Sequence, residues 1–262
     1  MKIQPVNINN NYTFKAKHKE LRKADDIVRN VNLQFPAFST SYAQRNWNVL
    51  SKKDTFLPLR IKIKILNERD KFNIECKKDK YALTVFDTLK ESKVGNCSEK
   101  NWLTLGALAA NGYYDSFRIS AQIKWNVIDK RNGKKVFAKD EDIDHDLILT
   151  TMNNTGNNTK DAVIVDGWLN KAMSFSEAKT TYFSMIKEKE MEEMKDRVTR
   201  EFITLNKDKE IDLNNYEFIP QISFTIPKNY LFNIKNKEDM IEFGEIIAQK
   251  YPELILKDRN DN

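Results

Sequence analysis

Cys97 stands in the stretch VGNCSEKNW, where it follows a glycine and an asparagine and precedes an acidic residue. Asn96 is a favoured N-cap residue and Glu99 lies three positions after it, so the pair predicts a capping box that makes Cys97 the first residue of a helix. The positive end of a helix dipole stabilises a thiolate close to it. The charge of Glu99 acts against that effect, so a nucleophilic Cys97 requires a base.

Histidine is the side chain that most often supplies such a base, and the chain contains two. His18 lies in the polar stretch KAKHKELRK, which predicts an exposed side chain. His145 lies in DIDHDLILTTM, at the start of a predicted strand. One ring nitrogen can face Cys97 while the other donates to a carboxylate, which holds a neutral imidazole in the tautomer that deprotonates a thiol. His145 is therefore the predicted general acid and base.

Asp166, in AVIVDGW, is the predicted orienting acid. It ends a strand that the turn NNTGNNTK pairs with the strand of His145, so both side chains can reach the same end of a sheet. Asp144 and Asp146 are nearer in the sequence, but neighbouring residues on a strand point to the opposite face. Trp168 can shield the imidazole and the carboxylate from water.

Each of these residues also has an ordinary structural interpretation. A cysteine at a helix start is commonly a packed thiol, a lone histidine on a strand is commonly structural, and an aspartate before glycine is commonly a turn former. The catalytic interpretation depends on the combination of the three residue types on elements that can converge. Chance convergence is the alternative, and the chain would then be a non-catalytic interaction protein.

Hydrophobic spacing predicts the elements that must position these residues. The segment SEKNWLTLGALAANGYY is apolar almost all round and predicts a buried helix that ends near Asn111 and Gly112. The segment FRISAQIKWNVIDKRNGKKVF alternates and turns at Asn132-Gly133, which predicts a hairpin. DHDLILTTM and DAVIVDGWL predict a second hairpin. Further strands are expected in LPLRIKIKIL and EFIPQISFTIP, and further helices in DKYALTVFDTLKES, SFSEAKTTYFSMIKEKEMEEMKDRVTREFITL (one long or two shorter) and KEDMIEFGEIIAQKYPEL.

These elements predict an α+β fold, in which a buried central helix carrying Cys97 packs on an antiparallel sheet carrying His145 and Asp166, with additional C-terminal helices. Residues 1–50 are rich in Asn, Lys and Ser, and we expect a loosely structured N-terminal arm there. Residues 51–262 are expected to form a single catalytic domain. Its core would span about 80–175, and its helical C-terminal extension 174–262.

Composition limits the classes of function. The chain has 262 residues, of which 40% are apolar and 31% charged, as in a soluble globular protein. Its 44 Lys and Arg and 38 Asp and Glu are interspersed, which argues against nucleic acid as a partner. No apolar run suits a signal peptide or a membrane span, and two cysteines cannot form a disulfide framework. We expect a cytoplasmic protein, or one delivered to another cell without a conventional signal peptide.

Cofactor sites are not expected. The two histidines and two cysteines do not stand at the spacing of metal ligands, so no metal is predicted. No glycine-rich phosphate-binding loop is present in the sequence. The predicted chemistry therefore depends on amino-acid side chains alone.

Together, VGNCSE, DHDLIL and VIVDGWL resemble the Cys, His and Asp motifs of papain-like and transglutaminase-like cysteine hydrolases. The pattern is most similar to compact bacterial effector peptidases and toxin glutamine deamidases. The resemblance covers about Val94 to Leu169, under a third of the chain. It implies Cys97 as nucleophile, His145 as general acid and base, and Asp166 as the orienting acid in a papain-like or transglutaminase-like core.

Two departures from the papain pattern concern spacing and the oxyanion donors. His145 follows Cys97 far more closely than the ~130–150 positions of papain relatives, which favours the compact arrangement. A papain-type oxyanion glutamine is missing before the cysteine. The backbone amide of Cys97 is then the expected first donor, and the side chain of Asn96 or Gln122 the second.

The expected activity is hydrolysis of an amide in a protein or peptide substrate through an acyl-enzyme. The leaving nitrogen distinguishes the reactions: a main-chain amide makes the enzyme a thiol peptidase, and a glutamine side chain makes it a deamidase. If an amine replaces water, the reaction is a transglutaminase-type acyl transfer. The sequence leaves these three open, because all of them use the same triad.

Overall fold

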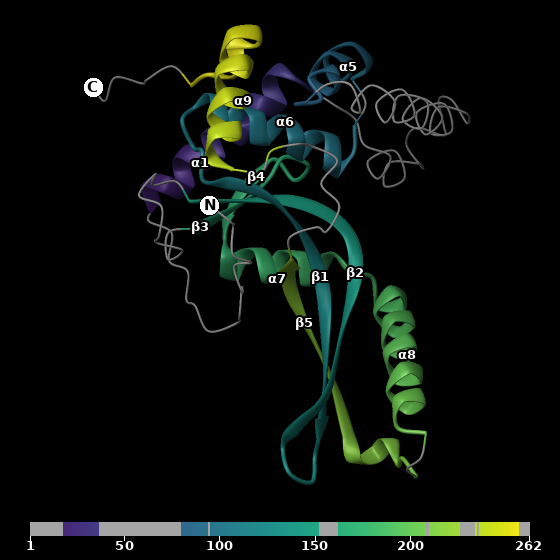
Figure 1. Ribbon diagram of the computed structural model, residues 1–262. Helices are drawn as coiled ribbons and strands as arrows, with labels where there is room; N and C mark the ends of the chain where they lie inside the picture. The colour runs from purple at the N-terminus through teal and green to yellow at the C-terminus, as the bar shows by residue number, and fades with distance from the viewer. Residues whose placement is uncertain are drawn as a thin grey trace. The chain divides into compact units, whose positions relative to one another are not determined.

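The computed structural model describes residues 18–36, 80–93, 95–151, 162–207, 210–225, 234 and 236–256. Over these residues the chain forms six α-helices and an antiparallel sheet of five strands in the order β4-β3-β2-β1-β5 (Figure 1). This confirms the expected mixed α+β class. The more specific papain-like arrangement of the core stays a prediction.

The chain divides into two compact units. Unit 1 comprises Met1–Ile119, Asp146–Phe175 and Pro227–Asn262, and unit 2 comprises Ser120–His145 and Ser176–Ile226. The sequence instead predicted one catalytic domain over 51–262. Strands β1 (Ser116–Asp129) and β2 (Lys134–Thr151) contain 14 and 18 residues. Most strands have about 3–10 residues. Both β1 and β2 are longer than that, so each can contribute side chains to more than one core.

Helix α1 (His18–Gln34) occupies part of the range expected to form a loose arm. Ala24, Ile27, Val28 and Val31 recur at helical spacing, and each exposes at most 2% of its surface. An apolar stripe of this kind stabilises a helix by packing on other elements. The expectation of a loose arm is therefore wrong for the described residues 18–36, which belong to the core of unit 1.

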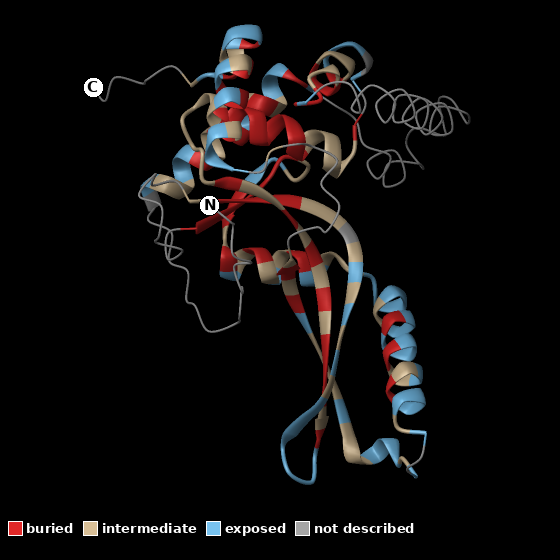
Figure 2. Cartoon of the chain, viewed as in Figure 1, coloured by how far each residue is buried: buried red, intermediate tan, exposed pale blue. Residues whose placement is uncertain are grey.

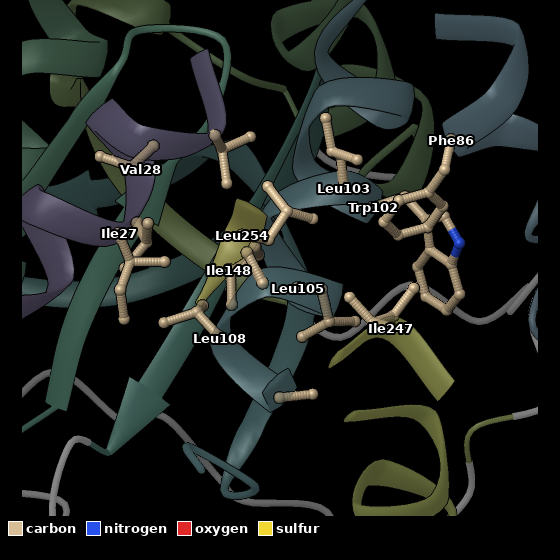
Figure 3. Close-up of a cluster of buried hydrophobic side chains, with 14 of the residues drawn as sticks. Ile27, Val28, Phe86, Trp102, Leu103, Leu105, Leu108, Ile148, Ile247 and Leu254 are labelled. Atoms are coloured by element: carbon tan, nitrogen blue, oxygen red, sulfur yellow. The ribbon is translucent and has the colours of Figure 1, made fainter. Parts of the chain in front are cut away.

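Helix α5 (Thr84–Ser92) forms within the segment that predicted it. The left-handed φ of 54° at Lys93 follows its end, in agreement with the expected break. Helix α6 (Cys97–Ala110) is buried from Asn101 to Ala109, which confirms the predicted central helix. Figure 3 shows side chains of α6 among those of α1, α5 and α9 in the core of unit 1.

Helix α9 (Lys237–Lys250), followed by the 3-10 helix η3 (Pro252–Leu254), ends where the sequence predicted. It is part of the core of unit 1 and not of an extension, because Phe243 and Ile247 are completely buried there. A Cβ at Gly244 would lie 2.6 Å from the carbonyl oxygen of Ala109. Helices α6 and α9 therefore approach so closely that only glycine fits at that position.

Two short strands complete the sheet in unit 1. Strand β3 (Ala162–Asp166) pairs with β2, with Ile148 opposite Val165, and β4 (Lys171–Ser174) pairs with β3. The antiparallel pairing of β2 with β3 confirms the second predicted hairpin. The turn NNTGNNTK lies outside the described residues, as does the predicted strand LPLRIKIKIL.

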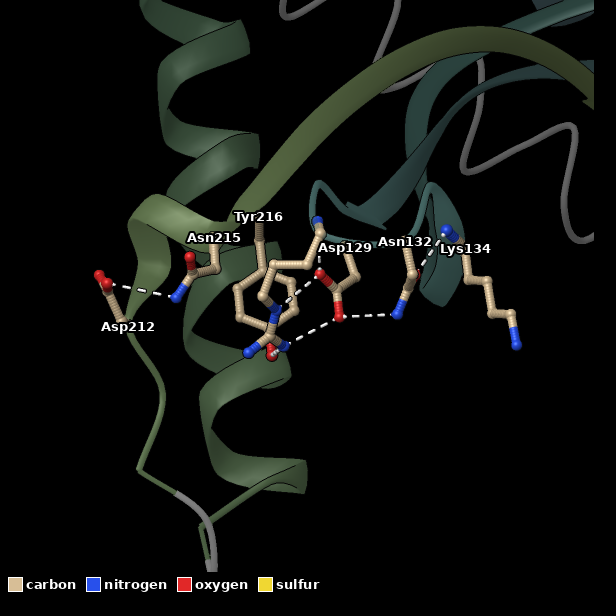
Figure 4. Close-up of polar contacts among 7 residues, drawn as sticks. Asp129, Asn132, Lys134, Asp212, Asn215 and Tyr216 are labelled. Atoms are coloured by element: carbon tan, nitrogen blue, oxygen red, sulfur yellow. Dashed lines mark hydrogen bonds and ion pairs between the residues drawn. The ribbon is translucent and has the colours of Figure 1, made fainter.

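Unit 2 is built on the first predicted hairpin. β1 and β2 turn at Asn132 and Gly133, where the φ of Gly133 is +67°, and β5 (Tyr216–Thr225) pairs with β1. The turn is fixed by Asp129, whose carboxylate accepts hydrogen bonds from Arg131 at 2.9 Å and Asn132 at 3.2 Å (Figure 4). The guanidinium of Arg131 also lies 5.7 Å from the centre of the Tyr216 ring. Tyr216 is the residue that follows the 3-10 helix η2 (Leu213–Asn215).

The long helical segment forms two helices, α7 (Phe175–Met185) and α8 (Glu188–Leu205), which is one of the two expected alternatives. Met194, Val198 and Phe202 form the buried stripe of α8 (Figure 2). The position of Met194 agrees with the expectation that it is a packing residue. The region 174–262 is not wholly helical, because it also contains β5. No helix in the described ranges is both long and apolar enough to cross a membrane.

Candidate active site

Cys97 is the first residue of α6, and its side chain is partly exposed. The backbone of Asn96 is extended, and its N–H donates to the carboxylate of Glu99 at 2.8 Å as part of a capping box. The predicted position of the thiol at a capped helix start is confirmed. The helix behind it has 14 residues, so its dipole is available to stabilise negative charge at this end.

An ion pair is hydrogen-bonded to Ser98, the residue that follows Cys97. Arg118 of β1 pairs with Asp146 of β2, and the two side chains expose only 12% and 13% of their surface. Ser98 donates its hydroxyl to the Asp146 carboxylate and accepts a hydrogen bond from Arg118 at 3.1 Å. The Nε of Arg118 is buried without a hydrogen-bond partner among the described residues. This cluster connects the first turn of α6 to both long strands.

Asn101, one helical turn after Cys97, joins two further segments to α6. It exposes 1% of its surface. Its Nδ2 donates to the backbone carbonyl of Asp146 at 2.5 Å, and its Oδ1 accepts the backbone N–H of Gly167 at 2.8 Å. Asp146 directly follows His145, and Gly167 directly follows Asp166. One amide side chain therefore bridges the residues next to two predicted catalytic residues.

Gly167 lies directly against α6. A Cβ at this position would lie 2.3 Å from Oγ1 of Thr104 and 2.7 Å from the carbonyl oxygen of Lys100. From the other side, Asn32 of α1 donates to the carbonyl of Gly167 at 3.0 Å. The close approach excludes any side chain, and the turn after Asp166 is held between α1 and α6.

Asp166 is completely buried. Its Oδ1 accepts the backbone N–H groups of Trp168 at 2.8 Å and Leu169 at 3.1 Å, so it stabilises the turn, as its ordinary structural interpretation expects. Burial lowers the pKa of Lys100, and the negative charge of Asp166 acts in the opposite direction. Lys100 also donates to Oδ1 of Asn32 at 3.1 Å. The turn thus brings a buried carboxylate near the first two turns of α6.

His145 and Gln122 belong to unit 2, whereas Cys97 and Asp166 belong to unit 1. The ring of His145 lies 5.2 Å from that of Tyr182 in α7, centroid to centroid, at an interplanar angle of 49°. The general acid and base role of His145 stays a prediction.

The supporting roles have a similar status. Gln122 lies opposite Ser223 in the pairing of β1 with β5, and its side chain is partly exposed. Its role as oxyanion donor stays a prediction, as does that of Asn96. Trp168 is also partly exposed, and its shielding of the imidazole stays a prediction.

Sequence analysis missed four polar residues near Cys97, namely Ser98, Lys100, Asn101 and Arg118. Only Asn101 had a usable signal, because a polar residue inside an otherwise apolar helix must find a hydrogen-bond partner once it is buried. Ser98, Lys100 and Arg118 occupy positions that ordinarily face solvent. Their hydrogen-bond and ion-pair partners are therefore determined only by the folded structure.

Comparisons with protein-family models, with curated proteins and with solved structures find no match to this chain. The resemblance to cysteine hydrolases therefore depends on the three sequence motifs. Among the described residues, no group of three or more His, Cys, Asp or Glu side chains could hold a metal ion.

Proposed function

We propose that the protein is a cysteine-dependent amide hydrolase acting on a protein or peptide substrate. In this proposal Cys97 is the nucleophile, His145 the general acid and base, and Asp166 the residue that orients the imidazole. The proposed fold of this catalytic core is papain-like or transglutaminase-like. No cofactor takes part.

The bridging side chain of Asn101 is the observation that carries this proposal. It is hydrogen-bonded to the residue after His145 and to the residue after Asp166, and it lies one helical turn from Cys97. A buried amide that satisfies both its donor and its acceptor in this way strongly constrains the two backbones it joins. It fixes the backbone that follows His145 and the backbone that follows Asp166 against α6, and this is the support for the proposal.

The proposed reaction has two stages. The Cys97 sulfur forms a bond to the carbonyl carbon, and the electron pair of the carbonyl moves to its oxygen. The carbon–nitrogen bond then breaks, and the nitrogen leaves with a proton from the His145 imidazolium. Water attacks the thioester, His145 takes a proton from that water, and cleavage of the carbon–sulfur bond restores the thiolate. The N–H of Cys97 and a side-chain amide would stabilise the oxyanions.

The leaving group determines which enzyme this is. Release of a new peptide N-terminus identifies a thiol peptidase, release of ammonia a glutamine deamidase, and incorporation of an added primary amine a transglutaminase. All three products can be measured in one incubation with unfolded protein substrates. Cys97→Ala, which removes the sulfur, should abolish whichever product forms.

Thiol alkylation tests the proposal without a known substrate. The experiment uses Cys76→Ser protein, so that Cys97 is the only thiol, and measures its rate of reaction with iodoacetamide at pH 7. A free thiol with a pKa near ~8.5 is only a few per cent ionised at that pH. We therefore expect the folded protein to react about tenfold faster than the same chain unfolded in urea.

Two histidine variants make a matched pair, because the chain has only His18 and His145. His145→Ala should reduce the alkylation rate to that of the unfolded chain, and His18→Ala should leave it unchanged. Asp166→Asn retains an Oδ1 that can accept the two turn N–H groups, so it should lower turnover while the fold persists. Alkylation no faster than in urea, with the two histidine variants alike, would refute the proposal.

The second candidate is a non-catalytic interaction protein. It is favoured by the hydrogen bonds of Asp166 to Trp168 and Leu169, which give the aspartate a structural role without any catalysis. In that case Cys97 is a packed thiol and alkylation should be slow in every variant.

A further inference from the structure

The cluster of Ser98, Arg118 and Asp146 holds the residue that follows Cys97, and all three side chains belong to unit 1. Ser98 donates its hydroxyl to the Asp146 carboxylate and accepts a hydrogen bond from Arg118 at 3.1 Å. A hydroxyl has one hydrogen to donate, so these two bonds fix the direction of the Ser98 side chain. The first turn of α6 is therefore attached to both β1 and β2.

The capping of α6 does not account for the hydrogen bonds of Ser98. A serine near a helix start commonly bonds to the backbone of its own turn. In α6, Asn96 and Glu99 already form the capping box. The hydroxyl of Ser98 instead donates to Asp146, which is 48 positions away in the sequence. This hydrogen bond joins two distant segments.

Asp146 is attached to α6 at two points. Asn101 donates to its backbone carbonyl at 2.5 Å, and Ser98 donates to its carboxylate. Ser98 and Asn101 are three positions apart, so they lie on the same face of α6, about 4.5 Å apart along the helix axis. One hydrogen bond would allow the strand to pivot about a single atom. Two attachments along the axis also fix the direction of the strand.

Stability alone is a weak reason for a largely buried ion pair. The side chains of Arg118 and Asp146 expose only 12% and 13% of their surface. Removing charges from water costs about as much as their attraction returns, and apolar residues of similar size often stabilise a fold equally well. A charged pair with directional hydrogen bonds differs from such residues because it favours one arrangement of the segments that it joins.

We propose that Ser98, Arg118 and Asp146 are positioning residues for Cys97. They hold the first turn of α6, with the thiol and the N–H of Cys97, in one orientation. Asp146 also follows His145 directly in the sequence, so the same contacts limit how the proposed base can approach. This inference rests on the proposed function, because it assigns the cluster a role in that reaction.

Hydrogen exchange tests the attachment of the helix start and needs no catalysis. The N–H of Lys100 donates to the carbonyl of Asn96 at 3.0 Å, in the first turn of α6. We expect Ser98→Ala to speed the exchange of this N–H about tenfold, because a helix end without tertiary contacts opens readily. Thr104→Ala is the matched control, since its hydroxyl donates within α6 to the Lys100 carbonyl at 2.8 Å. Its effect on the same N–H should be clearly smaller.

The effect of His145→Ala on Cys97 tests the positioning role. The measurement is the rate of alkylation by iodoacetamide at pH 7 in Cys76→Ser protein, with and without His145→Ala. We expect a ratio of about ten between these rates while the cluster is intact. Ser98→Ala should bring the ratio close to one, and Ser98→Thr, which retains a hydroxyl, should restore it. A residue that only stabilises the fold would leave the ratio unchanged in protein that circular dichroism shows to be folded.

Replacing both charges separates positioning from stability. Arg118→Met together with Asp146→Leu substitutes apolar side chains for the buried pair, so the urea midpoint should stay close to that of the original protein. The backbone carbonyl at position 146 is still present to accept from Asn101. We nevertheless expect the ratio of alkylation rates to fall close to one. A stable double variant that keeps the ratio of about ten would show that the ion pair only stabilises the fold.

The two measurements distinguish failure of this inference from failure of the proposed hydrolase. Unchanged exchange in Ser98→Ala, or an unchanged ratio of alkylation rates in that variant, would overturn the positioning role. If His145→Ala has no effect while the cluster is intact, the hydrolase proposal fails. Hydrogen exchange then decides by itself whether the cluster anchors the start of α6.

Discussion

Gly167→Ala tests the contact between the β3–β4 turn and α6. The added methyl group would lie 2.3 Å from Oγ1 of Thr104 and 2.7 Å from the carbonyl oxygen of Lys100. The second contact is with helix backbone, which a rotamer change cannot relieve. The turn must therefore move away from α6, which strains or breaks the hydrogen bonds of Gly167 with Asn101 at 2.8 Å and Asn32 at 3.0 Å.

The expected loss of stability combines these effects. Overpacking a close contact costs about 1–3 kcal/mol, and each weakened hydrogen bond costs about 0.5–1.5 kcal/mol. We therefore expect Gly167→Ala to lower the free energy of unfolding by about 2–6 kcal/mol. Such a loss is a large part of the ~5–15 kcal/mol that stabilises a typical domain.

Urea unfolding monitored by circular dichroism measures this loss. Gly133→Ala is the matched control, since its Cβ would have no atom within 4 Å and only the positive φ of +67° opposes the substitution. That control should cost about 1 kcal/mol. Thr104→Ala in the Gly167→Ala background removes the shorter contact and should recover part of the loss. If Gly167→Ala costs no more than Gly133→Ala, the turn does not approach α6 as closely as described, and the reasoning fails.

Two further substitutions test the polar clusters. Arg118→Met should lower the free energy of unfolding by about 2–4 kcal/mol, because it leaves the largely buried Asp146 carboxylate without its cation. Urea unfolding measures this loss, and adding Asp146→Asn to the same variant should recover part of the lost stability. The hydrogen bonds of Arg131 lower the pKa of Asp129, so this pair stabilises the fold above about pH 4, and the contribution is lost as the pH falls through the lowered pKa. The difference in urea midpoint between the original protein and Asp129→Asn should therefore shrink below pH 4, and an unchanged difference down to pH 2 would contradict the pairing.

Local sequence information was enough for several elements because their physical causes lie within a few residues. The capping box of Asn96 and Glu99 determines where α6 begins. Gly133 allows the turn between β1 and β2, because it adopts a φ of +67° that residues with a side chain rarely adopt. Helix α1 was missed although its spacing was present, because the surrounding Asn- and Lys-rich sequence suggested a loose arm.

Tertiary structure decided the surroundings of Cys97. Arg118 lies on β1 and Asp146 on β2, and a charged residue on a strand is usually expected to face solvent. In the folded chain α6 approaches these strands, and the two side chains form a largely buried ion pair that is hydrogen-bonded to Ser98. Asn101 and Gly167 are far apart in the sequence, and their hydrogen bond depends on how the β3–β4 turn packs. Sequence by itself determines which side chains can react and where their own helices and strands begin. The partners of those side chains depend on packing between distant segments, because no local pattern encodes contacts over such separations.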